Sequence, residues 1–285
     1  MSMFRSRYIS RTSVVAFLLG VSGFAAHAQY YYRDIVVTGQ INAGFRAMEQ
    51  NRVSRVILKP ESADPSQPAV MLQQTVSRSP KMVVTHTRVP DATESWLKSY
   101  YSDRDQLLTT VDSTVDVVSR TTYTYDGSNR LTVIRHISVP VNDPPESEDH
   151  FWQYSEGGQP VSMLKIKNGT DSTFITFTAD EKGNPGEERA VHKAVASPVI
   201  YYYFDEARRL TDVAKYNSTA RRILPSYMFE YNSGNQVTQM IVVPEGSADY
   251  QTWRYTYEAN GLKEKDQCFS KQKQLVASID YSYTQ

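Results

Sequence analysis

Aromatic and aliphatic residues alternate with polar ones along most of the chain after residue 60, in short runs that turn-forming residues separate. In "YTYDGSNRLTVIRHISV", Tyr123 and Tyr125 share one face of a run with period two. The next run places four aliphatic residues on one face: Leu131, Val133, Ile137 and Val139. Period two is typical of β-strands, and the Asp-Gly-Ser-Asn between the runs supplies the residues of a tight turn. We therefore predict an all-β fold built from antiparallel hairpins.

The same unit recurs through two thirds of the chain, at spacings of 24 to 29 residues. Each copy has an aromatic residue, one intervening residue, an anchor that is usually tyrosine, and then an acidic or small polar residue. The anchors are Tyr101, Tyr125, Tyr154, Ala179, Phe204, Tyr231, Tyr257 and Tyr283. A unit of this length holds two strands and a turn, and a single hairpin is only marginally stable, so neighbouring units must pair edge to edge. We predict a large antiparallel meander of about seven hairpins, forming a curled sheet, a partial barrel or a short solenoid.

Three regions follow from these patterns. Residues 96–285 carry the repeats, and residues 29–95 match them poorly. In the second region "YYYRDIVVTG" resembles a strand, "NAGFRAMEQN" predicts a short helix with Phe45 and Met48 inward, and "RVSRVILKP" returns to strand. We interpret residues 29–95 as the N-terminal cap that a repeat array needs at its exposed end.

Residues 1–28 have the pattern of a secretory signal peptide. Arg5, Arg7 and Arg11 precede a short apolar run, and Ala26-His27-Ala28 is a cleavage site of the A-x-A kind. We expect cleavage after Ala28, and Gln29 rather than a lipobox cysteine follows the cut. The expected location is therefore secreted, periplasmic or in the cell envelope. After removal of the signal no transmembrane helix is expected.

Charge and cysteine content narrow the class of protein. Loss of the three leader arginines leaves 28 basic residues (31 − 3) against 31 acidic ones. A nucleic-acid partner is disfavoured, because such proteins carry a surplus of Lys and Arg on one face. Cys268 is the only cysteine, so an internal disulfide is excluded.

The search for chemistry identifies no catalytic and no cofactor-binding residue, and no metal site is assigned. The histidines are far apart and form no HExxH or paired-histidine spacing. The loop "PVNDPPESEDH" offers oxygen and nitrogen atoms at Asp143, Glu146, Glu148, Asp149 and His150, but it lacks the glycine-punctuated spacing of a calcium loop and is typical of a solvated acidic loop. Cys268 is either a nucleophile or, as lone cysteines usually are, a small buried hydrophobe. Paired carboxylates for glycoside hydrolysis stay open as an alternative.

The remaining candidates are the aromatic residues that precede the anchors by two positions. If they line an open sheet face, they bind a glycan or protein partner; if the face is covered, they form the core. These candidate partner-binding residues are Tyr123, Trp152, Tyr202, Tyr255 and Tyr281.

The motifs "YTYDGSNRLT" and "YYFDEARRLTDV" resemble the YD repeats of the RHS family, with Arg130-Leu131 and Arg209-Leu210 at the Arg-Leu positions. Ala179 replaces the tyrosine of that pattern, and Pro160 and Pro185 replace its leucine. The chain is also similar to uncharacterised secreted bacterial proteins of its length. The resemblance implies a β-hairpin repeat and an envelope or extracellular location. Long RHS chains form hollow shells around a toxin, and related YD proteins bind carbohydrate at cell surfaces.

These observations favour a non-catalytic secreted or envelope protein that binds a glycan or protein partner or serves as a scaffold. The alternative is a secreted hydrolase that acts on polysaccharide through carboxylates gathered in a sheet concavity. A third option, an outer-membrane barrel, requires an apolar band that Arg135 and Asp212 interrupt.

Overall fold

A computed structural model of the chain describes residues 30–90, 94–244, 247 and 249–285. The leader assigned to residues 1–28, with its cleavage site, lies outside these residues. The described part holds one helix and nineteen strands. They are α2 (Arg33–Gln50), β1 (Arg55–Ser62), β2 (Met71–Arg78), β3 (Lys81–Arg88), β4 (Ser95–Tyr101), β5 (Leu107–Ser113), β6 (Val117–Tyr125), β7 (Leu131–Pro140), β8 (Glu146–Tyr154), β9 (Pro160–Lys167), β10 (Asp171–Ala179), β11 (Pro185–His192), β12 (Val195–Ala196), β13 (Ile200–Phe204), β14 (Leu210–Asn217), β15 (Arg222–Tyr231), β16 (Val237–Val242), β17 (Gln251–Tyr257), β18 (Lys263–Ser270) and β19 (Leu275–Thr284).

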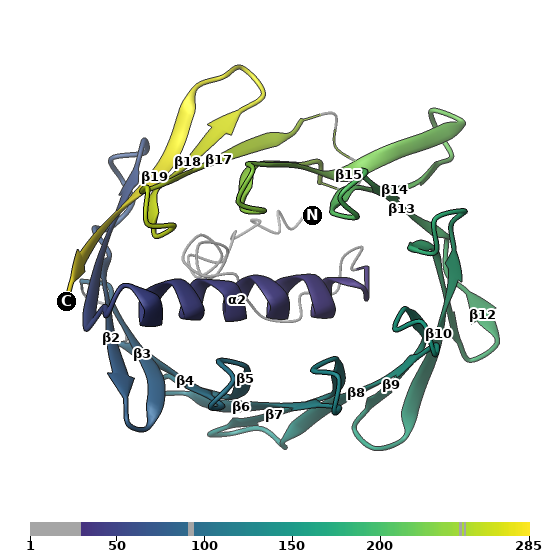
Figure 1. The fold of residues 1–285 in the computed structure, drawn as a ribbon, viewed down its shortest axis with the longest axis horizontal. Coiled ribbons are helices and arrows are strands. Elements are labelled where there is room, and N and C mark those ends of the chain that lie inside the picture. The colour runs from purple at the N-terminus through teal and green to yellow at the C-terminus, as the bar shows by residue number, and fades with distance from the viewer. Residues whose placement is uncertain (1–29, 91–93, 245–246, 248) are drawn as a thin grey trace, which may run out of the picture.

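The strands form a single antiparallel sheet that closes into a barrel (Figure 1). Apart from β12, each strand pairs with the next along the chain, and β1 pairs with β19 from Arg55↔Thr284 to Ser62↔Ala277. The two-residue β12 is a side branch, because β11 also pairs directly with β13. The closed circuit therefore has 18 strands (19 − 1). The predicted antiparallel meander is confirmed, and the sheet is more closed than the curled sheet or partial barrel that we expected.

Residues 55–88 belong to the wall of this barrel. We expected them to cap one end of the array, but β1 and β2 pair with each other and join β19 to β3. Pairing across the closure removes the unpaired edge that an open array would have to protect, which is the physical reason that no separate cap is needed there.

The repeated unit is a hairpin with a type I turn and a one-residue bulge. In the best-preserved copy the Asn129 amide donates to the Asp126 carbonyl, and the Asp126 amide donates to the Arg130 carbonyl. Asn129 has a φ of 65°, the left-handed conformation that completes this turn type. The residue at the same turn position has a positive φ in the other copies: Asp105, Gly158, Gly183, Arg208, Asn235 and Gly261.

A register shift directly before the anchor also recurs in every copy from Tyr101 to Tyr257. In the second copy Thr124 pairs with Val133 whereas Tyr125 pairs with Leu131, so Thr132 is the extra residue. Leu131 is consequently buried inside the barrel, while Ile137 and Val139 are exposed outside. The prediction that Leu131 shares a face with Val133, Ile137 and Val139 is wrong, because the bulge reverses the side-chain alternation.

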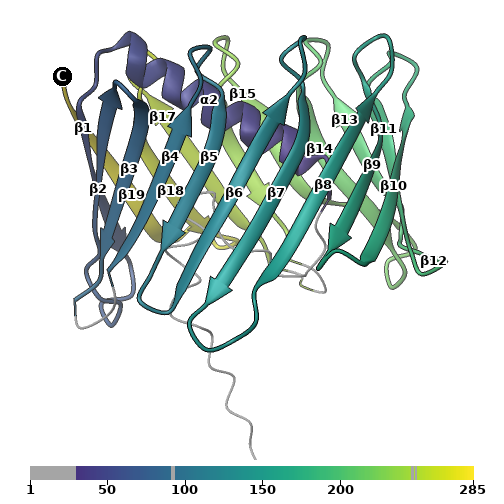
Figure 2. The ribbon, with the colours of Figure 1, turned by 90° about the horizontal axis from the view of Figure 1, so that it is seen from below.

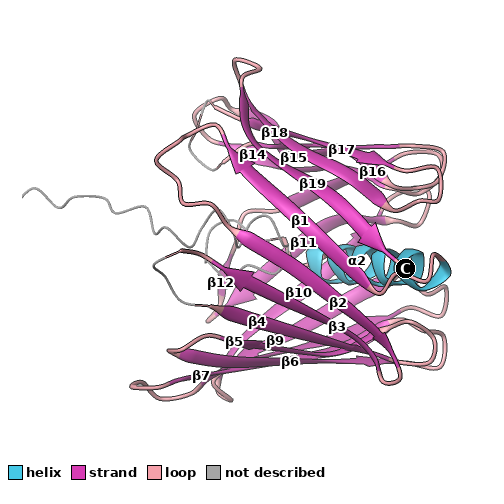
Figure 3. Cartoon of the chain, turned by 90° about the vertical axis from the view of Figure 1, so that its left-hand side faces the viewer, coloured by secondary structure: helices cyan, strands magenta, loops and turns pink. Residues whose placement is uncertain are grey.

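Helix α2 lies within the barrel, across the end that carries the tight hairpin turns (Figures 2 and 3). The strand expected at residues 30–39 is wrong, and the short helix expected at residues 42–51 extends back to Arg33. A strand inside a closed barrel would leave its backbone amides and carbonyls unpaired, whereas a helix pairs its own. This requirement outweighs the β-propensity of the Ile-Val-Val-Thr run at residues 35–38.

The core is the inner face of the barrel where it meets α2. One cluster surrounds the start of the helix, where Tyr32, Ile35 and Val36 pack against wall residues such as Met163 and Ile175. A second surrounds its end, where fully buried Phe45 stacks on Tyr101 with ring centroids 3.7 Å apart. Between them the Asn42 Oδ1 accepts the Leu107 amide at 2.8 Å. The helix is thus fixed to the wall along its length.

Candidate functional site

A network of charged side chains lies inside the barrel at the start of α2. His150 of β8 lies between two carboxylates: its Nδ1 is 2.6 Å from Asp34 Oδ2 of the helix, and its Nε2 is 3.0 Å from Glu148 Oε1. The other oxygen of Glu148 pairs with Lys165 Nζ of β9 at 2.7 Å. The indole Nε1 of Trp152 also donates to Asp34 Oδ2, at 3.3 Å. Residues i and i+2 of β8 and a residue of β9 directly opposite therefore meet the first turn of the helix.

The two carboxylates keep His150 protonated. Burial alone would lower the pKa of this imidazole, but the charge of Asp34 and the hydrogen bonds to Asp34 and Glu148 raise the pKa to about 9. Burial would likewise raise the pKa of Glu148, and the hydrogen bonds from His150 and Lys165 instead lower it to about 2. At neutral pH His150 is therefore a cation and Glu148 a carboxylate.

A third carboxylate, Glu188 of β11, binds the backbone just before the helix. Its Oε2 accepts the Tyr31 amide at 2.9 Å, the Tyr32 amide at 3.1 Å and the Tyr202 hydroxyl at 2.6 Å. Burial raises the pKa of Glu188 to about 7 despite these three hydrogen bonds, which lower it. A carboxylate in this place also interacts favourably with the positive end of the helix dipole.

These side chains hold the start of α2 against the barrel wall, and we call Asp34, Glu148, His150, Lys165 and Glu188 the clamp. A general base needs a pKa near the working pH, and His150 is held as a cation well above it. His150, Glu148 and Glu188 are each buried to 9 % exposure or less, and each is occupied by the hydrogen bonds described above. Sequence reasoning noted Glu148 and His150 but missed Lys165. It also missed Asp34 and Glu188, whose contacts with His150 and Tyr31 span 116 and 157 residues.

The acidic segment at residues 140–150 is mostly strand rather than loop. β7 extends to Pro140 and β8 begins at Glu146. Alternation along β8 then sends Glu148 and His150 inward, so these residues are not the solvated loop that we expected. Within the described residues no group of three or more His, Cys, Asp or Glu side chains is arranged to hold a metal ion.

The five predicted partner-binding aromatic residues all face the inside of the barrel. Trp152 and Tyr202 are 4 % and 3 % exposed and donate to the carboxylates described above. The Tyr281 hydroxyl donates to Asp266 at 2.9 Å, the Tyr255 ring lies 4.7 Å from Lys263 Nζ, and Tyr123 is opposite Ile134 in the register. The barrel brings them to one inner surface and α2 covers part of it. Their role in binding a partner stays a prediction.

Cys268 is buried on the inner face of β18, opposite Trp253. Burial raises the pKa of its thiol to about 11, which keeps it protonated and poorly nucleophilic at neutral pH. This environment is that of a small buried hydrophobe.

The outer wall carries an exposed aromatic platform on β3 and β4. The His86 and Trp96 rings stack with centroids 3.9 Å apart and planes 8° apart, and Trp96 is 40 % exposed. Glu94 Oε2 is 3.3 Å from His86 Nε2, and Glu94 Oε1 is 3.4 Å from Arg88 Nε. The sequence signal for this platform is weak, because Trp96 lies outside the aromatic columns of the repeat.

Comparison with known proteins finds only solved structures of low similarity. No family model matches the sequence, and no curated protein matches it. One similar solved structure is a porin-like protein from Bacteroides uniformis, with 10 % identity, a TM-score of 0.39, and coverage of 81 % of this chain and 98 % of that one. Another is the TcdB2-TccC3 chain without its hypervariable C-terminal region, with 12 % identity, a TM-score of 0.32, and coverage of 75 % of this chain and 11 % of that one. Both TM-scores are low, and neither likeness carries an argument about function. Among the described residues no helix is long and apolar enough to cross a membrane.

Proposed function

We propose that the protein is a non-catalytic secreted or cell-envelope module that binds a glycan on the outer wall of its barrel. The observation that carries this proposal is the stacked His86–Trp96 platform. A sugar ring packs its C–H face on an aromatic ring, and a broad exposed indole on a rigid sheet offers that surface at little entropic cost.

Hydrogen-bonding groups flank the platform in register. Gln73 of β2 lies opposite His86, and Ser113 of β5 lies opposite Trp96, so one row across the sheet reads amide, imidazole, indole and hydroxyl. With Glu94 beside it, this row supplies both donors and acceptors for sugar hydroxyls. His86 covers one face of the indole, and the 40 % of Trp96 that stays exposed is bordered by polar groups, which fits a neutral glycan better than an apolar peptide.

The location belongs to the same proposal. The pattern of residues 1–28 favours export, and the resemblance to YD repeats favours an envelope or extracellular protein. The interior of the barrel supports the non-catalytic part, because its buried charges bind the helix and one another.

A glycan array on the folded protein, followed by titration calorimetry on the best glycan, tests this function. Trp96→Ala should weaken binding by about tenfold or more, which corresponds to about 1.4 kcal/mol. Phe174→Ala is the matched control, because Phe174 is an aromatic residue of the outer wall with 51 % exposure on another strand. Equal binding by wild type and Trp96→Ala would remove the platform from the proposal. An empty array together with an empty pull-down would overturn the binding function.

One observation supports the alternative function as a hydrolase. Asp34, Glu148 and Glu188 converge at the start of α2, and Glu188 has a pKa of about 7. A screen of polysaccharides with reducing-sugar detection tests it. Turnover that disappears in both Glu188→Gln and Glu148→Gln, with the fold retained by circular dichroism, would favour the hydrolase over the binding module.

The outer-membrane option is supported by the closure of the sheet, which such a barrel requires. Against it, charged side chains are exposed on the outer wall within the middle of several strands, including Lys98, Arg120, Arg135 and Arg254. Migration in detergent gels that changes on heating would favour the membrane option, and unchanged migration would favour the secreted module.

A further inference from the structure

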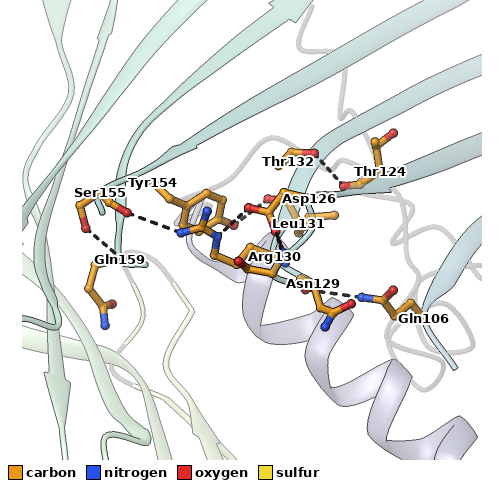
Figure 4. A network of polar contacts seen from close by, with 11 residues as sticks. Gln106, Thr124, Asp126, Asn129, Arg130, Leu131, Thr132, Tyr154, Ser155 and Gln159 are labelled. Carbon is orange, nitrogen blue, oxygen red and sulfur yellow. Dashed lines mark hydrogen bonds and ion pairs between the residues drawn. The ribbon is translucent and has the colours of Figure 1, made fainter. Parts of the chain in front are cut away.

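Five of the six anchor tyrosines of the repeat share one interaction. In five copies the hydroxyl donates, at 2.6–2.9 Å, to the carbonyl of the residue that directly follows the preceding hairpin turn. The pairs are Tyr125 with Leu107, Tyr154 with Leu131, Tyr231 with Leu210, Tyr257 with Val237 and Tyr283 with Lys263. Figure 4 shows one of them, in which the ring of Tyr154 reaches back to Leu131. Each tyrosine thus fills the space between two neighbouring turns.

Ala179 is the anchor of the copy that has no aromatic ring at this position. Phe204, the other anchor that is not tyrosine, still has a phenyl ring and packs 6.2 Å from the Tyr32 ring. By the register of the five complete copies, the acceptor that belongs to position 179 is the carbonyl of Pro160, which directly follows the turn ending at Gln159. Replacement of tyrosine by alanine removes the ring and the hydroxyl while the neighbouring turns keep their places.

A hollow of about 390 Å³ lies at this position, which we name the Ala179 hollow. A water molecule occupies about 30 Å³ of liquid, so the hollow has room for an aromatic ring. Its wall includes Pro160, Phe177 and Ala179, which give it a mainly apolar surface. The hollow thus lies at the copy of the repeat whose anchor lacks an aromatic ring.

The charges at the Ala179 hollow have one sign. Lys182, in the turn directly after Ala179, and Arg208, in the next turn, both line it. Among the described residues that line it there is no carboxylate. Both cations are exposed, and Lys182 also interacts with the Asp180 carboxylate of its own turn, so an anionic group of a ligand would share Lys182 with Asp180 and meet Arg208 from solvent.

We propose that the Ala179 hollow binds a para-hydroxyphenyl group that carries an anionic substituent. The ring lies against Pro160 and Phe177 beside the position of the missing tyrosine ring, tilted so that its substituent passes the Cβ of Ala179. Its hydroxyl donates to the Pro160 carbonyl, as the tyrosines of the complete copies do. The anionic group, at the other end of the ring, lies toward Lys182 and Arg208. This site is separate from the His86–Trp96 platform and does not depend on the glycan proposal.

The probe for this proposal is 4-hydroxyphenylacetate, titrated into the wild-type protein by ligand-observed NMR and calorimetry. p-Cresol lacks the anionic group, and phenylacetate lacks the hydroxyl; each should bind more weakly by about fivefold, the worth of about one hydrogen bond or exposed ion pair. Ala179→Tyr should place the chain's own ring in the hollow, abolish binding of the probe and raise the Tm. Tyr154→Ala should open an equivalent hollow beside Leu131 and add a second site for p-cresol.

The outcomes separate this proposal from a simple packing defect. Absence of probe binding by the wild type, or equal binding by wild type and Ala179→Tyr, would overturn the proposal. If Ala179→Tyr does not fold, Lys182→Glu replaces it: this exposed substitution should weaken 4-hydroxyphenylacetate and leave p-cresol unchanged, and an equal effect on both would also overturn the proposal. Trp96→Ala should bind the probe as the wild type does, so failure of the glycan function leaves this test intact.

Discussion

At the scale of single residues, the repeat is preserved by contacts between neighbouring copies. Asp126 accepts the amides of Ser128 and Arg130 within its own turn and pairs with the Arg130 side chain at 2.6 Å. The Arg130 guanidinium then lies 4.8 Å from the centre of the Tyr154 ring in the next copy. Arg209 lies over the Tyr231 ring at the same distance. In these two copies the Asp and Arg of the motif therefore link one turn to the anchor tyrosine of the next copy.

The hydroxyl of the anchor tyrosine should contribute to stability on its own. Tyr154→Phe removes only the hydrogen bond to the Leu131 carbonyl and keeps the ring beneath Arg130. We expect the free energy of unfolding to fall by about 0.5–1.5 kcal/mol, measured by urea denaturation. Tyr203→Phe is the control, because Tyr203 is on the outer wall and 49 % exposed. A loss in the control equal to that in Tyr154→Phe would contradict a specific role for the anchor hydroxyl.

At the scale of elements, α2 is held by charges at its start and by packing at its end. The hairpins could be predicted from the sequence because each turn depends on residues within five positions, such as Asp126 and Arg130. The place of the helix could not, because it depends on Asp34 meeting His150 and on Asn42 meeting Leu107, which are 116 and 65 residues apart. Burial inside the closed sheet decided the conformation of residues 33–38, against their local β-propensity.

The clamp on α2 predicts a pH dependence of stability. The folded pKa of His150, about 9, lies above its ordinary value of 6.5, so the protonated form is favoured in the folded state. Its contribution should be complete below about pH 6.5 and should be lost as the pH rises through about 9. Between these limits we expect the wild type to lose stability on the order of a few kcal/mol relative to His150→Gln, in urea denaturation at several pH values.

His86→Gln is the control for the clamp, because His86 belongs to the outer wall and does not contact α2. This variant should keep the stability profile of the wild type between about pH 6.5 and 9. If His150→Gln has the same profile as the wild type, the charges at the start of α2 do not hold the helix to the wall.

At the scale of the whole molecule, closure of the sheet explains both the wide interior and the helix within it. Barrels of 16 to 18 strands enclose a lumen that wall side chains alone do not fill, and a helix is about 10–12 Å across. The sequence indicated the strands but not their closure, since β1 meets β19 across more than two hundred residues and β1 lies outside the predicted repeats. Ala179 shows the converse: the sequence marked it as a departure from the repeat, and only the arrangement of three turns around it revealed a hollow.

The seam between β1 and β19 should control whether the barrel stays closed. Ile57 points outward at 40 % exposure and lies opposite both Ser282 of β19 and Gln73 of β2. Ile57→Pro removes a backbone donor from the centre of β1, whereas Ile57→Ala shortens the same side chain and keeps that donor. Ile57→Pro should open the seam, expose two strand edges and form larger species in size-exclusion chromatography, while Ile57→Ala should elute as the wild type. Larger species in neither variant would mean that the barrel stays closed without this part of the seam, because the helix and the remaining strand pairs hold it.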